Sequence, residues 1–426
     1  MPLSPWLAVI FAVPVLLLGE RLVRAVWVLR RFNLPAPVVG GLLVSLVVLA
    51  GNLTGLWPVA FGSKVAAQWW TWLVTPEHLW LAAPAKNVNL PLLVGFFTCI
   101  GLNASWALAK QGSTQVVVFL GAASVLAVIQ NALGVLLAKL LGVSPLLGLM
   151  CGSVTMTGGH GTALGFASEL EKAGLPAAAV VGVAAATFGL VAGGLLGGPV
   201  GGGLIRRFRL KPSAQPAAPP AAVAQDWPGI VGDLRALWRF GPVALLTLLT
   251  LAACIKLGAW VSYGLESLGL TFPVYIGAML VGVLVRNVVE AAGGRWLRTE
   301  VLDTLGSVLL GLFLAIAMMS LNLIELAHAA VPMLVILAAQ TTVMALFAWF
   351  VTYRLLGRDF DAAVMAGGHC GFGLGATPNA VANMKALVEN FGPAPRAFLV
   401  VPLAGAFLID FVNALNITTF LNLLKP

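Results

Sequence analysis

Charged side chains are scarce in this chain. Only 9% of its 426 residues are Asp, Glu, Lys or Arg, whereas 60% are hydrophobic. Soluble domains carry about 25% charged residues, so this composition excludes a soluble globular protein. The apolar runs are long and continuous, which disfavours a membrane barrel whose strands alternate in polarity. The composition therefore predicts an all-α polytopic membrane protein.

Motifs of enzymes and ATP-driven pumps are also missing. The chain has no GxxxxGK[ST] phosphate loop, no HExxH zinc motif and no nucleophile–base pair. Its four cysteines form no CxxC pair, so they indicate neither a metal site nor a disulfide framework. The net charge of +9 comes from residues scattered at the ends of apolar runs, which is typical of membrane topology and not of a nucleic-acid-binding face. We expect no enzyme, no transition metal, no cofactor and no nucleic-acid partner.

Apolar runs long enough to cross a bilayer, about 20 residues each, recur along the whole chain. The first has no basic residue before it, unlike a cleaved signal peptide. The segment 64–84 is rich in tryptophan and too polar to span, so we expect it to lie at the outer membrane surface. The predicted spans are residues 5–28, 37–56, 90–109, 115–138, 176–204, 238–261, 272–290, 304–323, 331–354 and 396–421.

A basic and then Pro/Ala-rich stretch, residues 206–229, divides the chain into two halves, 1–205 and 230–426. We expect it to be a flexible cytoplasmic linker. An external N-terminus places eighteen Lys and Arg residues on the cytoplasmic side and five or six outside, a strong positive-inside bias. An odd number of spans per half then gives the halves opposite orientations. We therefore predict two inverted five-span repeats with both termini external.

Two glycine-rich polar tracts interrupt the apolar pattern. Residues 152–162 read GSVTMTGGHGT, and residues 367–379 read GGHCGFGLGATPN. Broken backbone at membrane depth is tolerated only against protein or a watery cavity. A matched pair of such segments is typical of the binding site of a secondary transporter. A shift of 215 residues pairs Gly158 with Gly373 and Thr162 with Thr377, so we predict re-entrant loops at 144–167 and 361–383.

The tracts offer groups for both an anion and a hard cation. Helix N-termini favour anions, whereas hydroxyl and broken-backbone carbonyl oxygens suit Na⁺. Glycine can also serve only close helix packing, but such packing does not need polar side chains. The predicted substrate-binding residues in the tracts are Ser153, Thr157, Gly158, Gly159, His160, Gly161, Thr162, Gly371, Gly373, Gly375, Thr377 and Asn379.

Asp410 is the one carboxylate in the middle of an apolar span. A mid-span ionisable residue is a functional hypothesis by default, although it can also be a hydrogen-bonded packing residue. We predict that Asp410 faces a substrate ammonium or Na⁺, with Asn413 on the same helix face at i+3. His160 and His369 lack the further ligands that a zinc site needs, so we expect them to form hydrogen bonds. The predicted sodium ligands are Thr155, Thr187, Gly373, Asp410 and Asn413.

With these residues assembled, the chain resembles the bacterial glutamate:sodium symporter family. The resemblance is carried by the first tract, by the run from Phe360 into the second tract, and by residues 96–102 and 407–413. It implies Na⁺-coupled uptake of L-glutamate by an inner-membrane carrier that is an inverted-repeat dimer. It also makes an elevator-like motion plausible, in which spans 3–5 and 8–10 move with the loops against spans 1, 2, 6 and 7.

Two other functions stay open beside this one. A Na⁺-coupled carrier of another organic anion, such as a hydroxycarboxylate, would keep the same fold. A passive channel fits less well, because inverted broken helices suit alternating access. The expected partners are L-glutamate, Na⁺, membrane lipid and a second copy of the chain.

Overall fold

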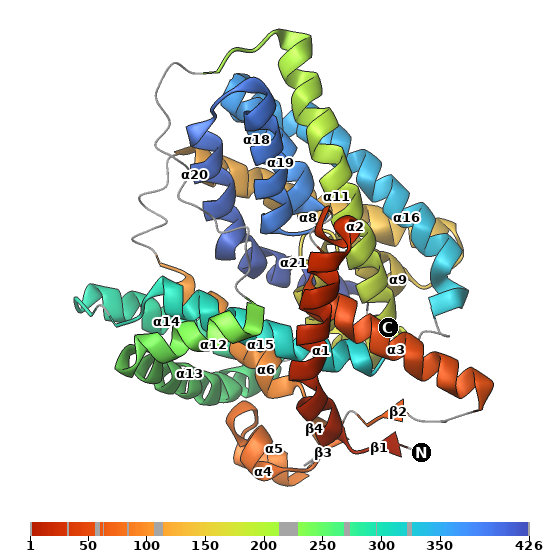
Figure 1. Cartoon of the computed structure of the whole chain (residues 1–426), viewed down its shortest axis with the longest axis vertical. Helices are drawn as coiled ribbons and strands as arrows, with labels where there is room; N and C mark the ends of the chain where they lie inside the picture. Colours follow the sequence, from red (N-terminus) through yellow and green to blue (C-terminus); the bar gives the residue numbers. More distant parts are fainter. Residues whose placement is uncertain are drawn as a thin grey trace. The chain divides into compact units, whose positions relative to one another are not determined.

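The computed structural model describes residues 2–31, 34–55, 60–62, 64–82, 85–105, 114–212, 229–267, 273–294, 296–321 and 326–424. Most of these residues are helical (Figure 1), which confirms the all-α fold class. The strands within them are pairs of residues: β1 (Pro2–Leu3), β2 (Ala60–Phe61), β3 (Lys64–Val65) and β4 (Lys86–Asn87). β1 pairs with β2 in parallel, and β3 pairs with β4 antiparallel.

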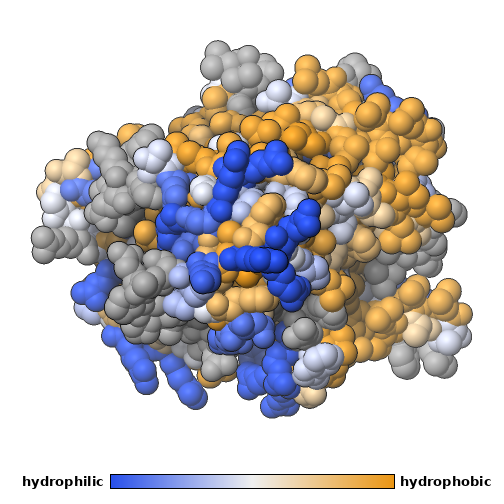
Figure 2. All heavy atoms as spheres, turned by 90° about the horizontal axis from the view of Figure 1, so that it is seen from above, coloured by the Kyte–Doolittle hydropathy of each residue, from blue (hydrophilic) through white to orange (hydrophobic). Residues whose placement is uncertain are grey.

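Seven helical segments of the described chain are long and apolar enough to cross a membrane. They are Pro5–Ala25, Ala36–Thr54, Thr114–Leu140, Ala178–Phe208, Pro242–Ser267, Thr299–Met319 and Ala330–Leu355. Hydrophobic residues cover the upper and right-hand parts of the face shown in Figure 2, and hydrophilic residues gather in its centre and along its lower edge. Many large hydrophobic side chains are exposed, as expected of a protein in contact with lipid. The protein is therefore a multi-pass membrane protein.

The other three predicted spans also contain helices, but these are shorter or interrupted. They are α6 (Leu90–Asn103), α14 (Tyr275–Ala291), and the run of α20 (Pro395–Leu403), the π-helical turn η5 (Ala404–Leu408) and α21 (Ile409–Leu424). The last run departs from the expected regular span, because Pro402 removes a backbone donor immediately before the π-helical turn.

The chain folds into two compact units that do not follow its halves. Unit 1 comprises Met1–Arg30, Leu34–Ala107 and Pro228–Leu323, and unit 2 comprises Arg31–Asn33, Leu108–Trp227 and Ile324–Pro426. Each unit therefore takes helices from both halves. The third and eighth predicted spans, α6 and α15 (Thr299–Met319), were expected with the loops, but they belong to unit 1. The compact units therefore group these two helices differently from the expected moving part.

Unit 1 is held together by close contacts between its helices. Its longer helices are α1 (Pro5–Ala25), α3 (Ala36–Thr54), α6, α12 (Gly229–Phe240), α13 (Pro242–Ser267), α14 and α15, and α2 (Trp27–Arg31) follows α1. α6 packs against both α14 and α15, and Gly101 of α6 lies against the backbone carbonyl of Met279. A side chain at Gly101 would collide with backbone, so glycine is what permits this close approach.

The tryptophan-rich segment folds on unit 1 as α4 (Gln68–Thr71), η1 (Trp72–Val74) and α5 (Glu77–Ala82). Lys256 of α13 binds this segment through several contacts. Its ammonium lies 2.8 Å from Glu77 and 4.2 Å from the Trp72 ring centroid, and it donates to the Trp72 carbonyl over 2.9 Å. Hydrogen bonding from Lys256 lowers the pKa of Glu77. No described helix of this segment is long enough to span a membrane, in keeping with the expectation.

The predicted linker is shorter than residues 206–229. α11 (Ala178–Phe208) runs through its basic start, and α12 begins at Gly229, where the Glu20 carboxylate accepts a hydrogen bond from the Ile230 amide over 2.7 Å. Residues 213–228 lie outside the described part of the chain. α12 ends before Gly241, whose φ of +49° separates it from α13, so the sixth span starts later than residue 238.

Unit 2 contains α8 (Thr114–Leu140), α11, α16 (Leu326–Phe347), the π-helical turn η4 (Ala348–Thr352) and α17 (Tyr353–Leu355), together with both glycine tracts and the α20–α21 run. α11 packs along α18 (Phe360–Gly373), as Figure 1 shows. Four glycines of α11, spaced by four residues, face the segment from α18 to α19: Gly189, Gly193, Gly197 and Gly201. This stripe lets two backbones approach closely, which accounts for many of the glycines outside the tracts.

Candidate functional site

The first glycine tract is an interrupted helix. α9 (Pro145–Leu149) continues into the π-helical turn η2 (Met150–Val154), and α10 (Gly159–Lys172) begins after a break at residues 155–158, here called the first break. Gly152 has the non-helical angles φ −90° and ψ −141°, and Gly159 has φ +62°. Glycine adopts such a left-handed conformation without the strain that a Cβ brings. The interruption therefore lies within the predicted tract.

The second tract is also interrupted. α18 ends at Gly373, and α19 (Thr377–Phe391) begins after residues 374–376, here called the second break. α18 and α19 pack against each other, as the two arms of a re-entrant hairpin would. Phe360 lies 215 residues after Pro145, but Thr377 lies 218 residues after Gly159. Gly158 and Gly373, which the 215-residue shift pairs, therefore occupy different places in the structure. Gly158 immediately precedes the helix after the first break, whereas Gly373 ends the helix before the second break.

The two breaks meet inside unit 2. A Cβ added to Gly159 would lie 2.8 Å from the carbonyl oxygen of Gly375. Gly189 of α11 contacts both breaks, because a Cβ there would overlap the Leu374 carbonyl oxygen and lie 3.0 Å from Cε of Met156. The N-termini of α10 and α19 both start at this junction, so two helix dipoles present their positive ends there.

Gln130 of α8 joins the two breaks through its side chain. Its Nε2 donates to the carbonyl oxygen of Gly373 over 2.7 Å, and its Oε1 accepts from the Thr157 hydroxyl over 2.7 Å. Gln340 of α16 donates to the backbone carbonyl of Gln130 over 2.7 Å. Gln130 and Gln340 are both fully buried. The amide nitrogen of the Gln130 side chain is therefore bonded beside the second break, and its amide oxygen is bonded to the first.

Ser153 is fixed by asparagines from two other helices. Its amide donates to Oδ1 of Asn131 over 2.7 Å, and its carbonyl accepts from Nδ2 of Asn413 over 3.0 Å. Oδ1 of Asn413 is buried and has no hydrogen-bond partner among the described residues. A buried oxygen acceptor without a partner is available to a cation or to a ligand donor.

The α20–α21 run reaches both breaks. The Thr377 hydroxyl donates to the Gly405 carbonyl over 3.0 Å at the second break, and Asn413 reaches Ser153 beside the first. Asp410 lies on this run between the two contact points. Its side chain is only partly buried, and within the described chain it has no hydrogen-bond or ion-pair partner. An unpaired carboxylate at this depth is costly unless a ligand or ion neutralises it.

The two histidines have different surroundings. His160 is buried at the start of α10, and its Nε2 lies 3.0 Å from the hydroxyl oxygen of Thr187 on α11. His369 is fully buried within α18 against the rings of Phe119, Phe347 and Phe372, with its Nδ1 2.8 Å from the Thr352 hydroxyl. His160 and Thr187 are thus placed at the junction, whereas His369 is a packing residue of the α18 arm.

The remaining candidate residues are divided between exposed and buried positions. Gly158, Gly161 and Thr377 are partly exposed, whereas Ser153, Thr157, Thr162 and Asn379 are buried. Asn379 donates to the Leu190 carbonyl over 2.7 Å, and Gly371 lies against the Asn379 backbone. Four of the five predicted sodium ligands form hydrogen bonds, each with a different residue. The Thr155 hydroxyl donates to the Met150 carbonyl, and the partners of Thr187, Gly373 and Asn413 are His160, Gln130 and Ser153.

Sequence reasoning missed the polar residues of the long spans that hold the tracts in place. Gln130 and Asn131 lie side by side in the middle of α8, and Gln340 occupies the middle of α16. The signal was present, because a polar side chain within an apolar span needs a partner just as Asp410 does. Asn383 on α19, which donates to the Gly193 carbonyl over 2.9 Å, belongs to the same class.

A family profile and the curated relatives that match this chain carry the same description. A family profile described as "Sodium/glutamate symporter" matches residues 2–74 and 58–393. The Sodium/glutamate symporter of Escherichia coli (strain K12) is 41% identical over 409 residues, covering 96% of this chain and 95% of that protein. The Sodium/glutamate symporter of Haemophilus influenzae is 39% identical over 402 residues, covering 94% and 93%. Among solved structures, a sodium proton antiporter from Methanocaldococcus jannaschii covers 99% of this chain and 98% of its own, with a TM-score of 0.43 and 14% identity.

Proposed function

The chain belongs to the sodium/glutamate symporter family, and from this premise we propose that the junction of its two helix breaks is the transport site. Its function is sodium-coupled symport of glutamate, with Na⁺ as the coupling ion, and it is a transporter and not an enzyme. The family does not favour a hydroxycarboxylate carrier or a channel. The observation that supports our assignment is the contact of the two breaks within unit 2, at Gly159 and Gly375.

Glutamate carries two carboxylates and one ammonium, and the junction offers groups of matching charge. The N-termini of α10 and α19 suit the carboxylates, and Gly161 and Thr377 at these N-termini are partly exposed residues. Asp410 suits the ammonium, because its carboxylate has no partner within the described chain. Thr187 and His160 border the same junction from α11 and α10. This arrangement accounts for recognition of an amino acid with two acidic groups.

Sodium binding is best supported beside Ser153. Hard cations take oxygen ligands, and Oδ1 of Asn413 is a buried oxygen without a partner in the described chain. Asp410 precedes Asn413 by three residues and so lies on the same helix face. Asp410 would then serve the ion and the substrate together, which is one physical route to coupling their binding. Thr155, Thr187 and Gly373 remain candidate ligands whose oxygens are hydrogen-bonded in this state.

Alternating access is proposed to move unit 2 as one body. Both breaks, Gln130 and Asp410 belong to this unit, so a rigid displacement would carry the whole site. The moving part then comprises the fourth, fifth, ninth and tenth predicted spans with the loops. The elevator motion and the inverted repeat are proposals, and the common pattern of a helix break in each half supports them.

The membrane setting follows from the same proposal. We place the carrier in the bacterial inner membrane as a homodimer in contact with lipid, with both termini outside. The positive-inside bias supports this orientation. Within unit 2, Lys139 ends α8, whereas Arg206 and Arg207 end α11 on the side assigned to the cytoplasm.

Uptake of labelled L-glutamate into proteoliposomes tests the function. An inward Na⁺ gradient is expected to drive accumulation above equilibrium, and inward K⁺ or H⁺ gradients alone are not. Collapse of the Na⁺ gradient with an ionophore should release the accumulated substrate, which a passive channel would not have concentrated. Equal uptake under all three gradients would contradict sodium coupling.

Asp410→Asn is expected to lower the kcat/KM for glutamate uptake by about 10- to 100-fold, because hydrogen bonds to charged groups contribute about 1.5–3 kcal/mol. The substitution keeps the shape of the side chain and removes its charge. Asp303→Asn is the matched control, since Asp303 lies on α15 of unit 1 and accepts a hydrogen bond from Asn103 over 2.8 Å. Transport by Asp410→Asn at the wild-type rate would remove Asp410 from the site.

A further inference from the structure

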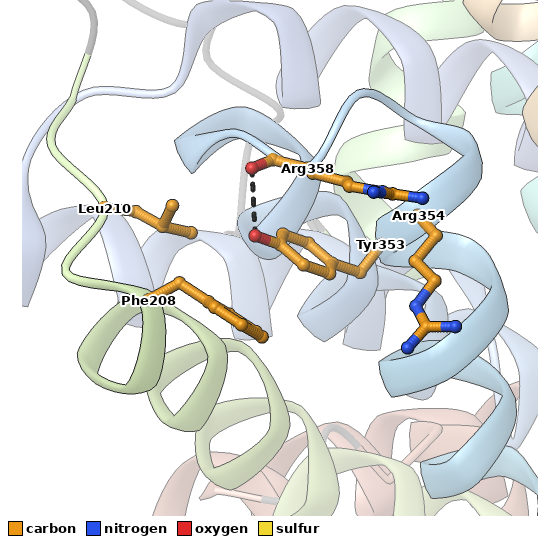
Figure 3. A pocket seen from close by; sticks show the side chains of 5 residues that line it. All are labelled: Phe208, Leu210, Tyr353, Arg354 and Arg358. Carbon is orange, nitrogen blue, oxygen red and sulfur yellow. Dashed lines mark hydrogen bonds between the residues drawn. The ribbon is translucent and has the colours of Figure 1, made fainter.

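A cavity of unit 2 lies at the ends of two long helices, away from the helix breaks. It has a volume of about 570 Å³ and is lined by Phe208, Leu210, Tyr353, Arg354 and Arg358 (Figure 3). Phe208 is the last residue of α11, and Tyr353 and Arg354 belong to α17. In the sequence these arginines indicate only membrane topology, and neither of them belongs to the proposed transport site.

The wall of this cavity is a fixed structure. The rings of Phe208 and Tyr353 are stacked, with centroids 5.4 Å apart and an interplanar angle of 16°. The Tyr353 hydroxyl donates to the Arg358 carbonyl over 2.9 Å, and the Arg358 amide donates to the Tyr353 carbonyl over 3.1 Å (Figure 3). Arg358 has φ +57°, a left-handed conformation that is costly for a residue other than glycine. These two hydrogen bonds hold the turn that carries Arg358.

The cavity carries uncompensated positive charge. Arg354 and Arg358 are exposed, and neither has an ion-pair partner within the described residues, although Arg354 lies 5.7 Å from the Phe350 ring centroid. The carboxylate next in sequence, Asp359, is already bound to the Arg396 guanidinium at 2.5 and 2.6 Å. Arginine binds phosphate through charge-assisted hydrogen bonds, and the lining of this cavity includes two arginines.

The depth of the cavity indicates the source of the phosphate. α11 and the segment Ala330–Leu355 are both candidate spans, and both end at the cavity. Their shared end therefore lies at the level of the lipid headgroups, on the side where lysine and arginine accumulate. Basic pockets between transmembrane helices on this side bind anionic headgroups. Phe208 and Leu210 add an apolar wall, which suits a lipid better than a free ion.

We propose that Arg354 and Arg358 bind the phosphate of an anionic phospholipid headgroup in this cavity. The site is two residues from Phe360, where the first arm of the second broken helix begins, and the Asp359 side chain caps that helix by accepting from the Ala362 amide over 2.9 Å. A bound headgroup would therefore fix the root of α18. The binding claim stands independently of the residues assigned to glutamate and sodium.

Native mass spectrometry of the delipidated, detergent-purified protein tests the site. Phosphatidylglycerol is expected to bind more tightly than phosphatidylcholine. The double variant Arg354→Gln/Arg358→Gln is expected to bind phosphatidylglycerol about 25-fold more weakly, since each arginine at an anionic membrane surface contributes roughly fivefold. The matched control is Arg235→Gln/Arg239→Gln, which removes two exposed arginines of α12 and should leave the affinity unchanged.

Two outcomes would overturn the proposal. Equal losses in the two double variants would show non-specific attraction, and displacement of phosphatidylglycerol by inorganic phosphate at similar concentration would show a free-anion site. The thermal shift of the wild-type protein on adding each lipid needs no variant. It should be larger for phosphatidylglycerol, and equal shifts for both lipids would exclude a headgroup-specific site even if the arginine variants do not fold.

Discussion

Gln130→Leu is expected to lower the initial rate of sodium-driven glutamate uptake by about 100-fold, because roughly 3 kcal/mol corresponds to that factor. Leucine fills a similar volume but cannot hydrogen-bond. It would leave the Thr157 hydroxyl and the Gly373 carbonyl buried without their observed partner. Each unsatisfied buried polar group costs about 1–3 kcal/mol. The substitution therefore removes both hydrogen bonds through which one side chain links the two breaks.

The same change at Gln115 is the matched control. Gln115 lies on α8 as well, but among the described residues its amide makes only a long 3.4 Å bond, to the Leu356 carbonyl, and it contacts neither break. Gln115→Leu should therefore keep most of the uptake. Thr157→Val should not add its full effect to Gln130→Leu, because both changes remove one shared hydrogen bond. If the two losses add, or if Gln130→Leu keeps full activity, the hydrogen bonds of Gln130 do not link the two breaks in a way that transport needs.

The membrane architecture could be predicted because its signal is local. A run of about 20 apolar residues can satisfy its backbone in lipid only as a helix, and every predicted span contains one. The errors lie where length or tertiary packing decides. α6 has 14 residues and packs against α14 and α15. Because of this packing it belongs to unit 1 and not to the unit that contains the two glycine tracts.

The helix breaks were predictable, but the residues that hold them were not. Glycine and small polar residues mark a break because they lack the local bonds of a continuous helix, and Gly152 and Gly159 have non-helical or left-handed angles within the tract. The partners Gln130, Asn131 and Asn413 come from other helices, 20 or more residues away in sequence. Their positions depend on how the helices pack against one another. No local pattern in a single sequence reveals that packing.

α12 illustrates the opposite case, because most of its helical pattern falls between the predicted linker, residues 206–229, and the predicted span, residues 238–261. Val231, Leu234 and Trp238 are exposed and recur at helical spacing, and Arg235 and Arg239 lie between and beyond them. These three apolar side chains therefore share one exposed face of α12. The Pro/Ala-rich composition before residue 229 obscured this pattern.

Gly159→Ala is expected to abolish measurable uptake, a loss of about 100-fold or more, because two costs add at one residue. A left-handed conformation costs a residue with a Cβ about 1–2 kcal/mol. The added Cβ would also lie 2.8 Å from the Gly375 carbonyl oxygen, so the second break has to shift. Overpacking of a close contact costs about 1–3 kcal/mol. Sodium-driven uptake measured at equal protein density gives the loss.

Gly174→Ala separates the two costs. Gly174 follows the C-terminal end of the same helix, α10, and has φ +104°, but no atom lies within 4 Å of where its Cβ would be. It therefore carries the backbone strain without a contact to the second break. Gly174→Ala should lower the melting temperature while uptake persists, whereas Gly159→Ala should lose uptake as well. If both variants lose only stability, the contact between the breaks does not serve transport, and the junction is a packing feature.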